Sequence, residues 1–230
     1  MSKYNRLIAY GSSPIDGTEL LGNSGKDKTL AFPAKLARAL ELDYVCRGKP
    51  LSSNSKISRK VLGSEHTDTD FVFVLWSSPN RYEFKTEQGW NGFTAHSETD
   101  NGLIREWLDG PGKLEYTEVY MSLKDIALTQ TYLKQNNLSY IFSMDNNAIK
   151  DSYCFNNPDP YLASIKSLID WDKFQWFDNN GFINWAKQNG FPFIGTHAGA
   201  EAHSIATDYV LNHWMTSFVS PTESIQNSNA

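Results

Sequence analysis

The chain has 230 residues, of which 40% are hydrophobic and 13% aromatic, so it can bury a large core and is not intrinsically disordered over most of its length. Its 21 Lys and Arg against 26 Asp and Glu give a net charge of −5, which argues against nucleic-acid binding through phosphates. No apolar run is long enough to span a bilayer and no signal-peptide pattern is present, so we expect no membrane partner and a cytoplasmic location. Cys46 and Cys154 fit neither a disulfide framework nor a metal site.

The chain alternates short apolar runs with helical patterns, which is typical of a doubly wound α/β protein. In chain order, the apolar runs predict strands at 7–10, 44–46, 71–76 and 139–142. The helical patterns fall at 33–42, 54–62, 118–134, 160–169, 183–188 and 199–213. The run at 71–76 is apolar at every position, as expected for a strand covered on both faces. We therefore predict a single α/β domain over residues 1–219, built on a parallel sheet between helical layers, and a flexible tail at 220–230.

Local signals mark the ends of two predicted helices. Pro33 fits the first turn of its helix, where the missing N–H needs no partner. Asn54 is expected to cap the next helix, which Gly63 closes. A polar segment at about 77–115 then interrupts the alternation without clear periodicity. Its length indicates an insertion that binds a ligand or acts as a lid.

Two serines, Ser12 and Ser13, follow the first predicted strand directly, where Gly11 permits close approach of the backbone. Ligands of doubly wound sheets bind beyond the carboxyl ends of the strands. A hydroxyl at this place can therefore act as a nucleophile, and the following turn can aim backbone N–H groups at a developing oxyanion. The alternative is an ordinary strand-to-helix turn, in which Ser, Gly and Asp are common.

Histidines are the second kind of candidate residue. His197 is predicted in a loop before the last helix, where an imidazole can act as general base, although a structural role is the alternative. For His203, six residues later, we favour a packed or capping side chain. The remaining histidines are interpreted as surface residues: His66, His96 and His213. The Asp68-Thr69-Asp70 group lacks companion ligands for a cation, so no metal is expected.

Together these segments resemble the SGNH (GDSL-like) hydrolases. Members of that family carry Gly-Asp-Ser after the first strand, present here as Gly11-Ser12-Ser13, and two histidines six residues apart, as in His197 and His203. The second family block is similar to residues 46–57, and the third is similar to Trp76-Ser77-Ser78-Pro79-Asn80-Arg81-Tyr82-Glu83. The latter run resembles divergent SGNH-like proteins of tailed phages, which implies a place in the host cytoplasm or the virion. The resemblance extends over about residues 6–215.

The resemblance implies a flavodoxin-like sheet and a serine esterase that needs no cofactor. By that analogy, Ser13 attacks an acyl carbonyl and His197 transfers the proton. The oxyanion would be held by the Ser13 backbone N–H, by a second-block N–H near Ser52, and by a third-block side chain. That side chain is Ser78 by strict spacing, or Asn80 if the loop is shifted.

The sequence departs from the family pattern in all four blocks. In the second block the family Gly aligns with Leu51 or Ser52, and in the third the family Asn aligns with Ser78 or Asn80. Ser12 replaces the family Asp, although the nucleophilic serine is kept.

The family Asp before the last-block His would fall at Ile194 or Gly195, and neither can orient an imidazole. Losing that carboxylate costs roughly 10⁴-fold in a serine protease triad, so a backbone carbonyl or an acid from another strand end would have to substitute. The candidates for this support are Asp145, which follows a predicted strand, and His203.

Two functions follow from these residues, and we favour the first. It is a serine esterase acting on a small-molecule or carbohydrate ester, with Trp90, Phe93 and Trp107 of the insertion stacking on a sugar or lining an acyl pocket. The alternative is a catalytically decayed SGNH-like domain that binds a carbohydrate or a protein. Nucleotide binding is disfavoured, because residues 22–26 lack the glycine spacing of a phosphate loop. Substrate identity and oligomeric state cannot be predicted from these patterns.

Overall fold

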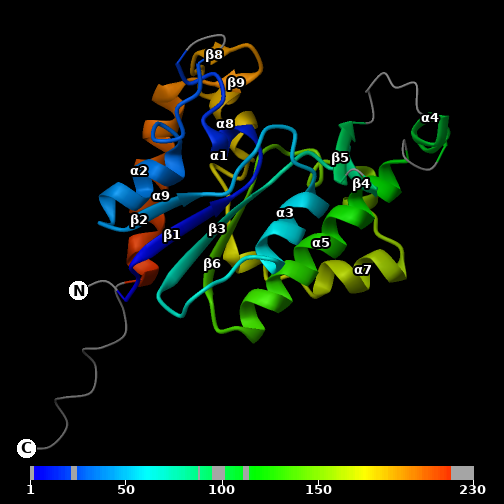
Figure 1. Ribbon diagram of the computed structural model, residues 1–230, viewed down its shortest axis with the longest axis horizontal. Coiled ribbons are helices and arrows are strands. Elements are labelled where there is room, and N and C mark those ends of the chain that lie inside the picture. Colours follow the sequence, from blue (N-terminus) through cyan, green and yellow to red (C-terminus); the bar gives the residue numbers. More distant parts are fainter. Residues whose placement is uncertain (1–2, 22–24, 88, 95–101, 111–113, 219–230) are drawn as a thin grey trace, which may run out of the picture.

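The computed structural model of the chain describes residues 3–21, 25–87, 89–94, 102–110 and 114–218 (Figure 1). A central sheet of five strands has the order β2-β1-β3-β6-β7, and every neighbouring pair is parallel. Its strands are β1 (Arg6–Tyr10), β2 (Asp43–Cys46), β3 (Asp70–Trp76), β6 (Ser139–Met144) and β7 (Phe174–Gln175). This is the flavodoxin-like strand order, so the predicted fold class is confirmed.

Helices cover both faces of the sheet (Figure 1). One face carries α2 (Phe32–Ala39), α8 (Phe182–Gln188) and α9 (Ala200–Phe218), and the other carries α3 (Asn54–Leu62), α5 (Glu115–Gln135) and α7 (Pro160–Ser167). Successive side chains of a strand point to opposite faces, so each strand contributes to two cores. In β3, Phe71 and Phe73 pack on the α2 side, whereas Val72 and Val74 pack on the α3 side. Burial on both faces accounts for the continuous apolar run of β3.

Helix α3 has the predicted limits, but the predicted cap is wrong. The Ser53 Oγ accepts a hydrogen bond from the Lys56 N–H at 3.1 Å. Asn54 is buried instead, and its amide donates to the Ser77 carbonyl at 3.1 Å and accepts from the Ser77 N–H at 2.7 Å. Because Ser77 directly follows β3, Asn54 fastens the start of α3 to the loop at the carboxyl end of that strand.

The predicted insertion contains regular structure that its sequence was not expected to form. It holds the strands β4 (Arg81–Thr86) and β5 (Gly89–Thr94), which form an antiparallel hairpin, and the helix α4 (Gly102–Asp109). The rings of Tyr82 and Phe93 stack across the hairpin with centroids 5.4 Å apart. The hairpin packs against α3, where Arg59 donates two hydrogen bonds of 3.0 and 2.8 Å to the Glu83 carboxylate. The insertion is therefore anchored beside α3.

Further elements are short: α1 (Ser13–Asp16), α6 (Tyr153–Asn156), the 3-10 helix η2 (Trp171–Lys173), β8 (Phe193–Ile194) and β9 (His197–Ala198). Among the described residues, no helix combines the length and apolar character needed to cross a bilayer. In the same part of the chain, no three His, Cys, Asp or Glu side chains gather as metal ligands. Asp70 of the Asp68-Thr69-Asp70 group instead accepts two hydrogen bonds of 2.7 Å from Arg6. The predicted tail at 220–230 and His96 lie outside the described residues.

Candidate active site

The turn after β1 places two serines at the carboxyl end of the sheet. Gly11 is required there, because a Cβ at this position would lie 2.6 Å from Ile15 Cγ1 and 2.9 Å from the Leu75 carbonyl oxygen. Ser12 is the N-cap of α1 and is fully buried, whereas Ser13 is the first residue of α1 and is 5% exposed. The Ser13 N–H stands at a helical position that has no intrahelical acceptor.

The side chain of Ser12 faces a buried acid. Its Oγ donates to Asp145 Oδ2 at 3.3 Å, and Asp145 directly follows β6. Burial raises the pKa of the Asp145 carboxyl, although the charges of Arg81 and His197 and the Ser12 hydrogen bond act in the opposite direction. Asp145 Oδ1 is buried and has no hydrogen-bond partner within the described part of the chain. The hydrogen bond to Asp145 thus connects the turn that carries Ser12 to the end of β6.

His197 approaches the same turn from the other end of the chain. It opens β9, which pairs with β8 in a short hairpin, and β9 packs against α1. The His197 Nδ1 lies 2.6 Å from Glu19 Oε2, and the two side chains are 18% and 25% exposed. The carboxylate that contacts this imidazole is therefore Glu19. Asp145, the candidate for that support, instead accepts from Ser12, and its interaction with His197 is electrostatic.

Glu19 occupies the space that a family-type Asp would need. A Cβ built on Gly195 would lie 2.8 Å from Glu19 Oε2, so the absence of a side chain at Gly195 leaves room for this carboxylate. Gly195 has φ +59, a left-handed conformation that glycine adopts without strain. Glu19 itself has φ +65, which costs a residue with a Cβ roughly 1 kcal/mol. The sequence offered no signal for this contact, because the two residues are 178 positions apart.

His203 serves the core, as its predicted packed or capping role requires. It is 2% exposed, and its Nδ1 accepts a hydrogen bond of 3.0 Å from the Phe32 N–H, the first residue of α2. Its ring packs against Phe182 with centroids 4.7 Å apart. His203 therefore caps the N-terminus of α2. His203 was also a candidate to support His197, but within the described part of the chain no hydrogen bond joins the two imidazole rings.

Of the other two described histidines, one is exposed and one is half-buried. His213 is exposed and stacks on Tyr209, as expected for a surface residue. The surface interpretation of His66 is wrong, because its ring is half-buried and its Nε2 lies 3.2 Å from the Val61 carbonyl. Burial lowers the pKa of His66.

Burial of His203 predicts a pH-dependent stability. Desolvation, with smaller contributions from Lys35 and His197, lowers the pKa of His203 to about 3. The unfolded chain takes up a proton on this ring below about pH 6.5, whereas the folded chain does not until about pH 3. Between about pH 6.5 and pH 3 the unfolded state therefore binds more protons than the folded state. The free energy of unfolding falls by about 1.4 kcal/mol for each unit by which the pH is lowered across this window. Urea unfolding between these limits measures the slope.

The control for this prediction is His203→Asn, which keeps an acceptor for the Phe32 N–H but cannot titrate. Asp145 and the other acids are shared by both proteins, so their effects cancel in the comparison. We expect the stability gap between wild type and variant to narrow as the pH falls. Parallel curves would contradict the assignment, as would an NMR titration in which the wild-type His203 ring becomes charged near pH 6.

The predicted oxyanion residues lie in two loops at the carboxyl ends of β2 and β3. The Ser52 side chain is buried and donates to the Lys49 carbonyl at 2.8 Å, so its hydroxyl is engaged within its own loop. That loop is tied to the serine turn, because the Lys49 N–H donates to the Gly11 carbonyl at 3.1 Å. Ser78 and Asn80 are half-buried in the loop between β3 and β4. The structure thus brings both loops to the strand ends, without distinguishing between the donors.

Arg81 is a residue of this region that the sequence analysis did not select. Its Nη1 donates to Ser77 Oγ at 2.7 Å, and its positive charge acts on the buried Asp145 carboxyl. Because Ser77 directly follows β3, this hydrogen bond holds the Arg81 guanidinium near the carboxyl end of that strand, the end of the sheet where Ser12 and Ser13 lie. The position of Arg81 in the Trp-Ser-Ser-Pro-x-Arg-x-Glu run was the available signal.

Comparison with known proteins gives structural relatives only. No protein-family model and no curated protein matches the sequence. The acetyl xylan esterase Est2A from the rumen bacterium Butyrivibrio proteoclasticus aligns with 96% of this chain and 66% of its own, at 14% identity and a TM-score of 0.51. A member of the lipolytic G-D-S-L family from Veillonella parvula aligns with 91% of this chain and 98% of its own, at 11% identity and a TM-score of 0.50.

A third solved structure is a carbohydrate esterase whose active site is described as displaying divergent catalytic and non-catalytic binding functions. It aligns with 94% of this chain and 70% of its own, at 12% identity and a TM-score of 0.53. The fold is that of the SGNH-like hydrolases. The present chain spans about two thirds of the length of the acetyl xylan esterase, 66%. At identities of 11–14% the likeness concerns the fold, so any statement on activity depends on the residues of the site.

Proposed function

We propose that this protein is a serine esterase of SGNH type in which Ser13, His197 and Glu19 form the catalytic triad. The observation that supports it is the 2.6 Å contact between His197 Nδ1 and Glu19 Oε2, in a strand that packs against the helix beginning with Ser13. A carboxylate on Nδ1 fixes the imidazole tautomer and stabilises the imidazolium, which is the role of the third triad member. Glu19 thereby supplies what Ile194 and Gly195 lack.

The proposed reaction has two halves. Ser13 Oγ bonds to the acyl carbon while His197 Nε2 takes the hydroxyl proton, and this proton passes to the leaving alcohol as the ester C–O bond breaks. Water then attacks the acyl-enzyme, giving its proton to Nε2, and the proton returns to Ser13 Oγ as the carboxylic acid leaves. In the proposal, the Ser13 N–H and donors from the loops with Ser52, Ser78 and Asn80 stabilise the oxyanion.

The proposed substrate is an O-acyl group on a carbohydrate. Aromatic side chains of the insertion support this, since Trp90 is 48% exposed and Trp107 is 36% exposed beside the Tyr82 ring. Exposed aromatic faces are suited to stacking on sugar rings. The structural relatives include an acetyl xylan esterase. From the resemblance to phage proteins, we further propose that the enzyme works in a host cytoplasm or in a virion.

An active-site serine probe tests the proposed function directly. The native full chain is treated with a fluorophosphonate, which reacts with serines activated by a neighbouring base. We expect labelling of Ser13, detected by peptide mass spectrometry, together with hydrolysis of p-nitrophenyl acetate and release of acetate from acetylated xylan. An unlabelled native chain without turnover of any of these esters would rule out the esterase.

A second candidate function is carbohydrate binding without turnover. The observation that favours it is the Trp90 ring, which is 48% exposed and has the Arg59 guanidinium over it, 4.0 Å from the ring centroid. A ring fixed in this way is a preformed platform for a sugar. If Ser13→Ala and wild type bind xylan oligosaccharides with equal affinity and neither hydrolyses esters, whereas Trp90→Ala loses binding, this candidate replaces the first.

A further inference from the structure

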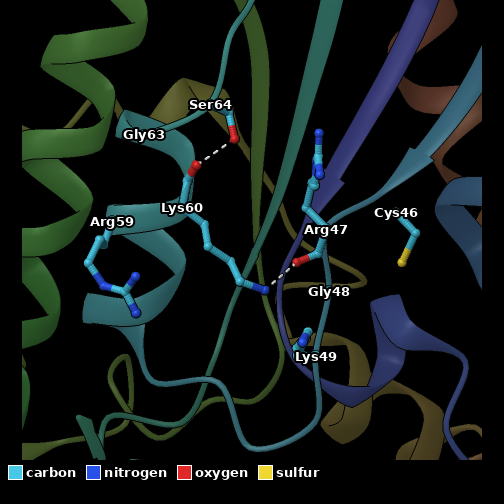
Figure 2. A pocket seen from close by; sticks show the side chains of 8 residues that line it. All are labelled: Cys46, Arg47, Gly48, Lys49, Arg59, Lys60, Gly63 and Ser64. Atoms are coloured by element: carbon cyan, nitrogen blue, oxygen red, sulfur yellow. Dashed lines mark hydrogen bonds between the residues drawn. The ribbon is translucent and has the colours of Figure 1, made fainter. Parts of the chain in front are cut away.

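A basic pocket lies between the loop after β2 and helix α3, on the side of the sheet that α3 covers (Figure 2). Its volume is about 470 Å³. Residues from both elements line it: Cys46, Arg47, Gly48, Lys49, Arg59, Lys60, Gly63 and Ser64. No residue of the proposed triad is among these described lining residues, so the pocket requires an explanation of its own.

Charge is concentrated in this part of an otherwise acidic protein. The stretch from Tyr44 to Ser64 contains no Asp or Glu, although the whole chain has a net charge of −5. Its basic residues are Arg47, Lys49, Lys56, Arg59 and Lys60. Glu83 compensates the charge of Arg59. Repulsion among the remaining cations disfavours their gathering, so their presence around a recess indicates a place for an anion.

Lys60 is the central group of the pocket. Figure 2 shows its side chain extending from α3 across to the β2 loop, where Nζ donates to the Arg47 carbonyl at 2.8 Å. The ammonium has three donors and this contact uses one of them. Burial, followed by the charges of Lys56 and Lys49, lowers the pKa of Lys60 to about 8. A bound anion would accept from the remaining donors and offset this unfavourable environment.

The other cations of the pocket differ in whether they are available to bind an anion. Arg59 is committed to Glu83 by two hydrogen bonds and to the Trp90 ring, so it forms a fixed wall. Arg47 and Lys49 are exposed, and they stand on the loop opposite α3. Both residues line the pocket together with Lys60. The pocket therefore combines one oriented ammonium with two exposed cations.

The backbone holds the loop with Arg47 and Lys49 in a fixed position. A Cβ at Gly48 would lie 2.7 Å from Ile15 Cγ2 and 3.0 Å from the Asp16 nitrogen, so only glycine permits this packing against α1. The Lys49 N–H is bound to the Gly11 carbonyl. The basic loop is consequently fixed on the serine turn, and the pocket is preformed.

We propose that this pocket binds a small oxyanion, a phosphate or sulfate group, held by Lys60 with Arg47 and Lys49. A recess bounded by three usable cations matches one compact, doubly charged group, whereas a nucleic acid or a membrane requires a basic face that extends over many residues. The site is separate from the proposed triad, so the proposal does not depend on esterase activity.

Calorimetric titration of the full chain at low ionic strength tests this proposal. The probes are inorganic phosphate, sodium sulfate and glycerol phosphate, with glycerol as the uncharged control. We expect saturable binding of one anion per chain, weakening as sodium chloride is added. Tighter binding of glycerol phosphate than of inorganic phosphate would identify a phosphate ester as the ligand, and the reverse order would identify the free ion.

Variants distinguish a specific anion-binding site from non-specific attraction between the anion and the positive charges of the protein surface. Lys60→Met keeps the aliphatic stem of the half-buried lysine, and Arg47→Gln with Lys49→Gln changes only exposed side chains. We expect each to raise the dissociation constant of phosphate at least about tenfold. Lys173→Gln is the matched control, because it removes the same charge next to β7, at the opposite edge of the sheet. Undetectable binding by wild type, or equal weakening in the Lys173 variant, would overturn the proposal.

Discussion

Replacing Ser13 with alanine is expected to abolish ester hydrolysis, lowering kcat/KM by roughly 10⁴- to 10⁶-fold. The physical reason is that the proposed mechanism passes through a covalent acyl-enzyme, which cannot form without the hydroxyl, so only binding and oxyanion stabilisation remain. The folded structure should tolerate the change, because alanine at the first position of α1 removes a hydroxyl that makes no hydrogen bond within the described residues. Initial rates on p-nitrophenyl acetate measure the loss.

Ser12→Ala is the matched control for this experiment. It removes the same atom one residue earlier, where the hydroxyl donates to Asp145 at 3.3 Å. Because Asp145 is buried, Ser12→Ala leaves a carboxyl with one partner fewer and is expected to reduce stability by about 1–3 kcal/mol while retaining the fluorophosphonate label. If Ser12→Ala loses the label and Ser13→Ala keeps it, the nucleophile has been assigned to the wrong serine.

The central sheet could be predicted from the sequence because its strands are buried on both faces. The run Phe71-Val72-Phe73-Val74 has no polar residue, and such a run between turn signals leaves few alternatives to an inner strand. The two-residue strands β8 and β9 carry no such signal. Their pairing depends on the chain around Gly195 turning back, with Ile194 opposite His197, and a local pattern does not encode that contact.

The insertion illustrates a signal that was present and not recognised. Tyr82 and Phe84 alternate with Arg81, Glu83 and Lys85, which is the period-two pattern of a half-buried strand. The segment is short, and the polar residues around it obscure the alternation. Its partner strand contains two glycines and contributes less periodicity still. The hairpin is stabilised by contacts made in the folded protein, among them the Arg59 pair with Glu83, and these appear only once α3 lies beside it.

The site shows the same limit in chemical terms. Ser13 follows the predicted first strand, so the rule that ligands bind at the carboxyl ends of parallel strands selected it. His197 was selected by its place in a loop before the predicted last helix, six residues ahead of His203. Glu19 could not be selected, because an acid in a loop has no pattern that distinguishes it from a solvated side chain. What the sequence did contain was the vacancy at Gly195, where a family-type acid is missing. A family histidine that is kept without its family carboxylate predicts that an acid from another part of the chain contacts the imidazole.

Removing the Glu19 carboxylate is the second large effect that we expect. Glu19→Ala should lower kcat by roughly 10²- to 10⁴-fold with little change in KM, because the acid orients His197 without touching the substrate. Glu19 is one-quarter exposed, so the variant should fold. A kcat within about threefold of wild type would exclude Glu19 as the positioning residue, and a change confined to KM would assign it to substrate binding instead.

Restoring an acid at the vacant position gives the decisive second variant. In the Glu19→Ala background, Gly195→Asp places a carboxylate two residues before His197, and aspartate tolerates the left-handed conformation at φ +59 better than most residues. We expect kcat to recover about tenfold or more, in line with the contribution of an orienting carboxylate. In the wild-type background the same substitution should be harmful, because its Cβ would lie 2.8 Å from Glu19 Oε2 and two carboxylates would compete for one imidazole. If Glu19 had a purely structural role, Gly195→Asp would lower kcat in both backgrounds. A rise of kcat in the Glu19→Ala background together with a fall in the wild-type background would show that Glu19 acts by orienting the His197 ring.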